Sequence, residues 1–192
     1  VCAMTGGLDS GVSALLAFKA LGQRLHCIFV DTGLLRDHEG DKFMAFYRDA
    51  IGMRITRVYA QTRFLNALAG LSDAAEKRAA VSRTMHAILL EETQKLGPID
   101  AVIRGTNCND VMFGNHDEAG LAPEGAAVIE PVRELFKDEI RRVGDFLGLP
   151  GELVSRQPFP GSGLALRILG EVTVERLQTL RAVDLIFRQE VG

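Results

Sequence analysis

Thr5-Gly6-Gly7-Leu8-Asp9-Ser10 is the stretch that decides the fold of this chain. It follows a short apolar run at residues 1–4 and opens a helical pattern with Val12, Leu15, Leu16 and Ala20 on one face. A strand, a glycine turn and a helix start in this order predict an anion site. The first amides of a helix have no internal partner, and the helix dipole is positive at that end.

Each residue type in this turn suits a phosphate ligand. Gly6 and Gly7 carry no Cβ, so the turn can adopt positive φ and an anion can approach the backbone closely. Thr5 and Ser10 add hydroxyl donors. Asp9 would repel a polyanion unless a cation lies between them, and Mg²⁺ bridging its carboxylate to phosphate oxygens resolves that conflict.

A simpler interpretation stays open on these six residues alone. The two glycines can form an ordinary turn while Asp9 or Ser10 caps the helix. The stretch is neither G-x-x-x-x-G-K-[ST] nor G-x-G-x-x-G, and no lysine follows the glycines before Lys19. We therefore expect that backbone amides, hydroxyls and a metal hold any phosphate here.

Composition limits the class of protein. The 192 residues fit one domain, and 47% hydrophobic residues are enough for a core. No apolar run reaches the roughly 18 residues of a membrane span. The net charge of −3 argues against a general nucleic-acid surface. Three scattered cysteines indicate neither a disulfide framework nor a zinc site, and they favour a reducing cytoplasm. The chain reads as a fragment of a longer protein.

Short apolar runs alternate with amphipathic stretches along the chain. Strands are predicted at 25–30, 55–59, 101–104 and 128–129, and helices at 37–51, 61–68, 73–96 and 137–147. This alternation predicts an α/β fold, an open doubly wound parallel sheet of about five strands with helices on both faces. In such a sheet ligands bind beyond the carboxyl ends of the strands, where the turns 5–10, 31–36 and 105–110 all lie.

Several segments resemble the ATP-pyrophosphatase domain of GMP synthase, a type with the adenine nucleotide alpha hydrolase-like fold. The resemblance lies in the sequences at 5–10, 30–36, 68–78, 130–139 and 158–167, the last followed by Ile-Leu-Gly-Glu-Val-Thr. The glycine turn alone marks a wider family that includes NAD synthetase and tRNA-thiolating enzymes. Leu-Phe-Lys-Asp-Glu at 135–139 and Pro-Phe-Pro-Gly-Ser-Gly at 158–163 are more specific to GMP synthase.

The resemblance implies a ligase that uses ATP and Mg²⁺. ATP adenylates xanthosine monophosphate with release of pyrophosphate, and ammonia then displaces AMP to give GMP. The implied catalytic residues are Asp9, Ser10 and Asp110, with Asp9 and Asp110 as metal ligands. The implied ATP-binding residues are Thr5, Gly6, Gly7, Leu8, Asp9, Ser10, Val30, Asp31, Gly33, Arg36, Gly105 and Thr106. The implied acceptor-binding residues are Arg78, His116, Pro160, Gly161, Gly163 and Arg167.

The sequence departs from the family pattern at several points. Gly11 stands where the family has a second serine, and the lid that carries a Glu and a Lys after residues 105–112 does not appear. Either a lid segment is missing from this sequence or the chain is a divergent relative, and the loss of the lid lysine would put activity in doubt. For Arg78, a solvated charge at a helix start is the competing explanation, and for 158–167 it is loop packing.

The resemblance also implies partners. We expect residues 1–150 to form the ATP-pyrophosphatase core and 151–192 to form a connector and a helix that leads toward a dimerisation domain absent from this chain. A glutamine amidotransferase domain or subunit would supply the ammonia, and the protein would be a cytoplasmic homodimer that binds neither nucleic acid nor membrane. Two alternatives remain: an ATP-pyrophosphatase acting on another acceptor by amidation or thiolation, and a non-catalytic nucleotide-binding relative.

Overall fold

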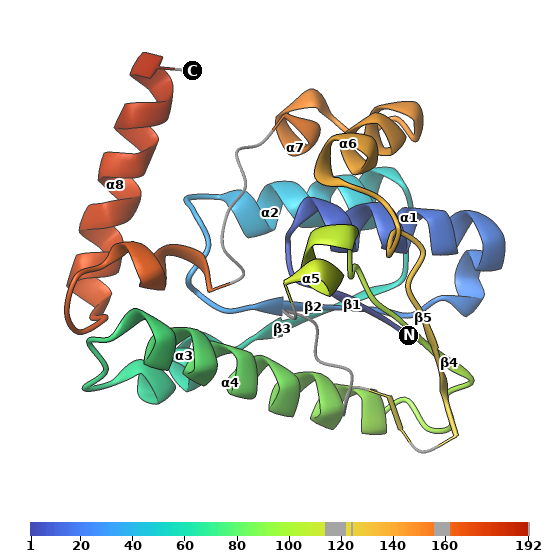
Figure 1. The fold of residues 1–192 in the computed structure, drawn as a ribbon, viewed down its shortest axis with the longest axis horizontal. Helices are drawn as coiled ribbons and strands as arrows, with labels where there is room; N and C mark the ends of the chain where they lie inside the picture. The colour runs from blue at the N-terminus through green and yellow to red at the C-terminus, as the bar shows by residue number, and fades with distance from the viewer. Residues whose placement is uncertain (114–121, 124, 156–161, 192) are drawn as a thin grey trace.

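A computed structural model describes residues 1–113, 122–123, 125–155 and 162–191. These residues form a five-stranded parallel sheet in the order β3-β2-β1-β4-β5 (Figure 1). The strands are β1 (Cys2–Met4), β2 (Cys27–Asp31), β3 (Ile55–Tyr59), β4 (Ala101–Ile103) and β5 (Ala127–Ile129). The predicted α/β class and the number of strands are confirmed.

Helices cover both faces of the sheet (Figure 1). One face carries α1 (Leu8–Leu21), α2 (Glu39–Met44), α6 (Lys137–Phe146) and α7 (Gly151–Val154), and the other carries α3 (Gln61–Leu68) and α4 (Ala74–Gln94). The short α5 (Cys108–Met112) follows β4. The last helix, α8 (Val174–Val191), stands at the side of the molecule and joins the second core cluster through Leu177.

Alternate residues of β2 enter two separate cores. Cys27 and Phe29 belong to the cluster beneath α1, α2 and α6, whereas Ile28 and Val30 belong to the cluster beneath α3 and α4. All four side chains are at most 1% exposed. This two-sided burial explains why the strand reads as a continuous apolar run rather than an alternating pattern.

Element boundaries differ from the sequence prediction by one or two residues at several ends, of which three have a visible cause. The strand predicted at 25–30 begins two residues later, because Gly22–Arg24 form a 3₁₀ turn that Leu25 closes. The helix predicted at 37–51 begins at Glu39 and changes to a π-helical turn over Ala45–Ala50. The helix at 73–96 begins after Asp73, whose carboxylate accepts the amides of Ala75 and Glu76.

The order of the strands places the topological switch point between β1 and β4. Strands β2 and β3 extend the sheet on one side of β1, and β4 and β5 extend it on the other. In parallel sheets ligands bind at such a point, beyond the carboxyl ends of the strands, and the turns after β1 and β4 both follow strands next to it. Within the described ranges, no helix is both long and apolar enough to cross a membrane.

Candidate functional site

The glycine turn is held by hydrogen bonds within itself. Ser10 Oγ accepts the Thr5 amide at 3.2 Å and donates to the Gly7 carbonyl at 3.1 Å. Gly6 has a φ of 80°, a backbone conformation that would be strained in a residue with a side chain. Gly7 is the N-cap of α1 and no side chain caps this helix, so the interpretation of Asp9 or Ser10 as a cap is wrong. The hydroxyl of Ser10 shapes the turn, and among the described residues no side chain caps the start of α1.

Asp9 is paired with a lysine that is distant in sequence. Lys137 is the first residue of α6, and its Nζ lies 2.5 Å from Asp9 Oδ2. The two side chains are 29% and 19% exposed, so the pair faces a partly open space. The other oxygen, Asp9 Oδ1, is buried and has no hydrogen-bond partner among the described residues. The acid next to the anion site thus has a cation on one oxygen and a vacant lone pair on the other.

Asp110 has a structural role at the start of α5. Its Oδ2 accepts the Asn107 amide at 3.1 Å, while the Asn107 side chain accepts the Asp110 amide, which forms a capping box. Across the described residues, no group of three or more His, Cys, Asp or Glu side chains is arranged to hold a metal. A Mg²⁺ ion at this site would fit Asp9 Oδ1 together with oxygens from a ligand and from water.

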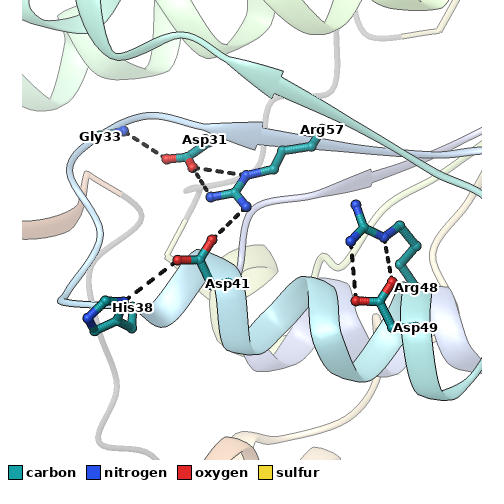
Figure 2. Close-up of polar contacts among 7 residues, drawn as sticks. All are labelled: Asp31, Gly33, His38, Asp41, Arg48, Asp49 and Arg57. Atoms are coloured by element: carbon teal, nitrogen blue, oxygen red, sulfur yellow. Dashed lines mark hydrogen bonds and ion pairs between the residues drawn. The ribbon is translucent and has the colours of Figure 1, made fainter.

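The second turn follows β2, and Asp31 fixes its shape. Figure 2 shows Asp31 Oδ1 accepting the Gly33 amide at 3.2 Å and Oδ2 accepting from the Arg57 guanidinium at 2.6 Å. Arg57 also contacts Asp41 at 2.7 Å, and this hydrogen bond holds the pKa of Asp41 below its ordinary value. Gly33 has a φ of 68°. Both oxygens of Asp31 are therefore committed to protein groups.

The third turn lies directly against the first. A Cβ at Gly105 would fall 2.5 Å from the Ser10 amide nitrogen and 2.8 Å from the Asp9 carbonyl carbon. A Cβ at Gly6 would lie 3.8 Å from the Leu35 side chain of the second turn. The structure therefore brings the three turns predicted from the sequence together around the start of α1.

Glu130 orients the third turn from the end of β5. Thr106 Oγ1 donates to Glu130 Oε1 at 2.5 Å, and Arg133 donates to Oε2. Burial acts to raise the pKa of Glu130, but the hydrogen bonds from Thr106 and Arg133 outweigh it and hold the pKa below the ordinary value. Glu130 is therefore a carboxylate at neutral pH, and it fixes the Thr106 hydroxyl as a donor toward itself.

Of the six residues predicted to bind an acceptor, the structure describes three: Arg78, Gly163 and Arg167. Arg78 is exposed on α4, whereas its neighbour Lys77 is 1% exposed and donates to the Ile168 carbonyl at 2.7 Å. Arg167 is paired with Asp184 of α8 at 3.2 Å. Gly163 approaches the second turn, and its Cβ position lies 2.4 Å from the Leu34 carbonyl oxygen. His116, Pro160 and Gly161 lie outside the described residues.

Sequence reasoning missed Lys137, Glu130 and the residues of α8. Lys137 and Glu130 both lie in the segment 130–139, which served only to indicate a family. The available signal was position: each follows the fifth predicted strand, whose carboxyl end lies at the same edge as the glycine turn. No pattern along the chain indicated that Lys137 would turn toward Asp9.

Gly11 is required because Tyr47 occupies the space beside it. A Cβ at Gly11 would lie 2.2 Å from Tyr47 Oη, and the tyrosine is 1% exposed. We expect Gly11→Ala to lower the free energy of unfolding by about 1–3 kcal/mol through overpacking. Tyr47→Phe in the same background should recover part of that loss. Urea denaturation measures both, with Gly151→Ala as a control because no atom lies within 4 Å of that Cβ position. Equal losses at Gly11 and Gly151 would contradict this explanation.

This chain is similar to known proteins over its whole length. The family model described as NAD synthase matches residues 1–167. Glutamine-hydrolysing GMP synthases of Clostridium tetani and Clostridium acetobutylicum are each 46% identical to this chain over 203 residues. The matches cover 100% of this chain and 40% of each relative, so the chain spans less than half of their length. The predicted resemblance to GMP synthase is confirmed.

Solved structures share the fold. The NMN synthetase of Francisella tularensis has a TM-score of 0.64 at 17% identity, covering 94% of this chain and 82% of that protein. The ammonia-dependent NAD synthetase of Campylobacter jejuni has a TM-score of 0.62 at 16% identity, covering 99% and 76%. At these identities the likeness concerns the fold alone, and it confirms the predicted α/β architecture.

Proposed function

This chain belongs to the NAD synthase family, and on that basis we propose that it is the ATP-pyrophosphatase domain of a GMP synthase. The domain would adenylate xanthosine monophosphate with ATP, release pyrophosphate, and pass the adenylate to ammonia to give GMP and AMP. The observation that carries the proposal is the convergence of the glycine turn, the Gly105 turn and the Asp9–Lys137 pair around one helix N-terminus. A site of this kind stabilises a departing polyphosphate.

The β- and γ-phosphates would lie against the start of α1. Gly6 and Gly7 give them access to the backbone amides, and Lys137 supplies a positive charge as pyrophosphate develops. Asp9 would hold Mg²⁺ through Oδ1, and the ion would supply additional neutralisation of phosphate charge. The substrate oxygen attacks phosphorus itself, so the protein needs no nucleophile.

The adenosine would lie over the end of β2. The last pair between β1 and β2 is Met4 with Phe29, so β2 continues for two residues, Val30 and Asp31, past its neighbour. This extension faces the switch point and would present backbone groups to the base. Because both Asp31 oxygens bind protein groups, we assign Asp31 to shaping the turn rather than to holding ribose.

The acceptor and the partners follow from the relatives. Arg78, Gly163 and Arg167 would contribute to the xanthosine monophosphate side, and Asp110 would act by positioning α5. The relatives are named as glutamine-hydrolysing, so ammonia would come from a glutaminase domain or subunit in a cytoplasmic homodimer.

The matched region is 203 residues long against 192 here, and we infer that the additional residues of the relatives include the lid. Residues 1–150 would be the core and 151–192 the connector.

A panel of acceptors tests the proposal. The full-length protein that contains this chain is incubated with ATP, Mg²⁺, excess ammonium and either xanthosine monophosphate or a nicotinate nucleotide, and pyrophosphate and AMP are measured. We expect equimolar pyrophosphate and AMP with xanthosine monophosphate only. Turnover with the nicotinate nucleotide alone would favour an acceptor like those of the NAD synthetases that share the fold. ATP binding without pyrophosphate release from any acceptor would identify a non-catalytic relative.

A further inference from the structure

The second turn, residues 33–36, is held by the C-terminal segment through its carbonyl groups. Arg181 of α8 donates from Nε to the Leu35 carbonyl at 3.0 Å and from Nη2 to the Gly33 carbonyl. The Leu164 amide donates to the carbonyl between them, that of Leu34, at 2.8 Å. Three consecutive carbonyls of the turn are therefore bonded to residues more than 120 positions later in the chain.

The last residue of the same turn, Arg36, is held by an ion pair with α8. Arg36 Nε lies 3.3 Å from Asp184 Oδ2, and the two side chains are only 8% and 6% exposed. Asp184 also contacts Arg167 at 3.2 Å and Arg188 at 2.8 Å. Arg167 and Arg188 are each 41% exposed, so the buried member of this group is the Arg36–Asp184 ion pair, which restrains Arg36 more strongly than an exposed pair would.

These contacts determine which groups of the turn remain for a ligand. Asp31 accepts the Gly33 amide and Thr32 Oγ1 accepts the Leu34 amide at 3.0 Å, so both faces of the turn are specified by protein hydrogen bonds. The carbonyls of Gly33 and Leu35 accept from Arg181 of α8, and the Leu35 side chain points toward Gly6. If Arg181 is lost, the carbonyls of Gly33 and Leu35 lose a charged donor and the turn can rotate away from the glycine turn.

We propose that Arg181 is a positioning residue for nucleotide binding, and that docking of α8 on the turn 33–36 is energetically coupled to occupancy of the nucleotide site. This inference rests on the proposed function, because it takes the turn as the adenosine side of the site. Coupling is reciprocal, so a nucleotide that favours the observed turn also stabilises the docked helix. Arg181 acts through the turn and does not touch the nucleotide.

Calorimetric binding of a non-hydrolysable ATP analogue to the full-length protein tests the positioning role. We expect Arg181→Gln to weaken binding of the analogue by about tenfold. This is less than the full loss of two charge-assisted hydrogen bonds, because Arg181 acts on the nucleotide only through the turn. Arg181→Lys should recover part of the affinity, because an ammonium reaches one carbonyl more readily than two. Arg176→Gln is the matched control: this arginine lies on the same helix and donates to the carbonyls of Leu169 and Glu171 within its own segment. The affinity of the Arg176→Gln variant for the ATP analogue should be unchanged.

Hydrogen exchange provides a second test, made first on the unmodified protein and then on Arg181→Gln. We expect the analogue to slow exchange of the amides at 181–188 as well as those at 33–36, and Arg181→Gln to abolish the effect on α8. Normal binding by the unmodified protein with equal affinities for Arg181→Gln and Arg176→Gln would overturn the inference and leave the proposed function intact. So would normal binding without added protection of α8. Failure of the unmodified protein to bind the analogue would overturn both.

Discussion

Replacing Lys137 with methionine is expected to lower the rate of pyrophosphate release by about 10²–10³-fold, the usual effect of removing one charge-stabilising group from a transition state. Methionine keeps the length of the side chain and removes only the charge. Lys137 Nζ lies 2.5 Å from Asp9 Oδ2, beside the helix end where the phosphates would lie. Without it, an uncompensated carboxylate faces the leaving group. The rate is measured by coupled pyrophosphate detection at saturating ATP and acceptor.

Asp9 separates two explanations for this loss. Asp9→Asn should also lower Mg²⁺-dependent turnover to a small residual rate without unfolding the protein, because the amide offers a poorer metal ligand. If Lys137 only neutralises Asp9, the double variant Asp9→Asn/Lys137→Met should be no worse than Asp9→Asn. If Lys137 also stabilises the phosphates, the double variant should be slower than either single variant.

An exposed pair provides the matched control for Lys137. Lys42 of α2 and Glu152 of α7 are 2.7 Å apart, but their side chains are 63% and 77% exposed. Lys42→Met should leave turnover within about twofold, as expected for an exposed ion pair of little energetic consequence. Equal turnover in the Lys42 and Lys137 variants would remove the role that we assign to Lys137.

The sequence was sufficient for the layout of the fold because its signals are local. The apolar run that becomes β2, the long amphipathic stretch that becomes α4 and the glycine turn each depend on neighbouring residues. Strand boundaries were less accurate, since Gly22–Arg24 form a 3₁₀ turn that apolar periodicity does not register. The convergence of the three turns followed from the rule that ligands bind at the carboxyl ends of parallel strands.

The partners within the site could not be predicted from the sequence, because they join distant segments. Asp9 was expected to need a metal, yet the fold places Lys137 on one of its oxygens. Asp31 was predicted to bind a nucleotide, and its ion pair with Arg57 of the edge strand β3 could not be read from the sequence. Arg181 gave no signal at all, since an arginine on an amphipathic helix is most often solvated. Spacing along the chain carries no information on contacts of this range.

Replacing Gly105 with alanine is expected to have the second large effect, because the new Cβ would meet backbone rather than a movable side chain. The Cβ position lies 2.5 Å from the Ser10 amide nitrogen and 2.7 Å from its Cα. Gly105 has an ordinary negative φ, so the effect would come from close approach alone. The turn after β4 must then separate from the start of α1. We expect the free energy of unfolding to fall by about 3 kcal/mol, at the upper end for overpacking, and turnover to fall more than 100-fold.

Gly144 of α6 provides the control, since its Cβ position meets side-chain atoms at 3.5–3.7 Å, which is ordinary contact. Gly144→Ala should be neutral or stabilising by up to about 1 kcal/mol, because alanine restricts the unfolded chain. Urea denaturation gives the stability and calorimetry the affinity for an ATP analogue. The decisive comparison is at a denaturant concentration where Gly105→Ala is still folded. Nucleotide affinity that is unchanged there would mean that the contact between the first and third turns is not needed to form the site.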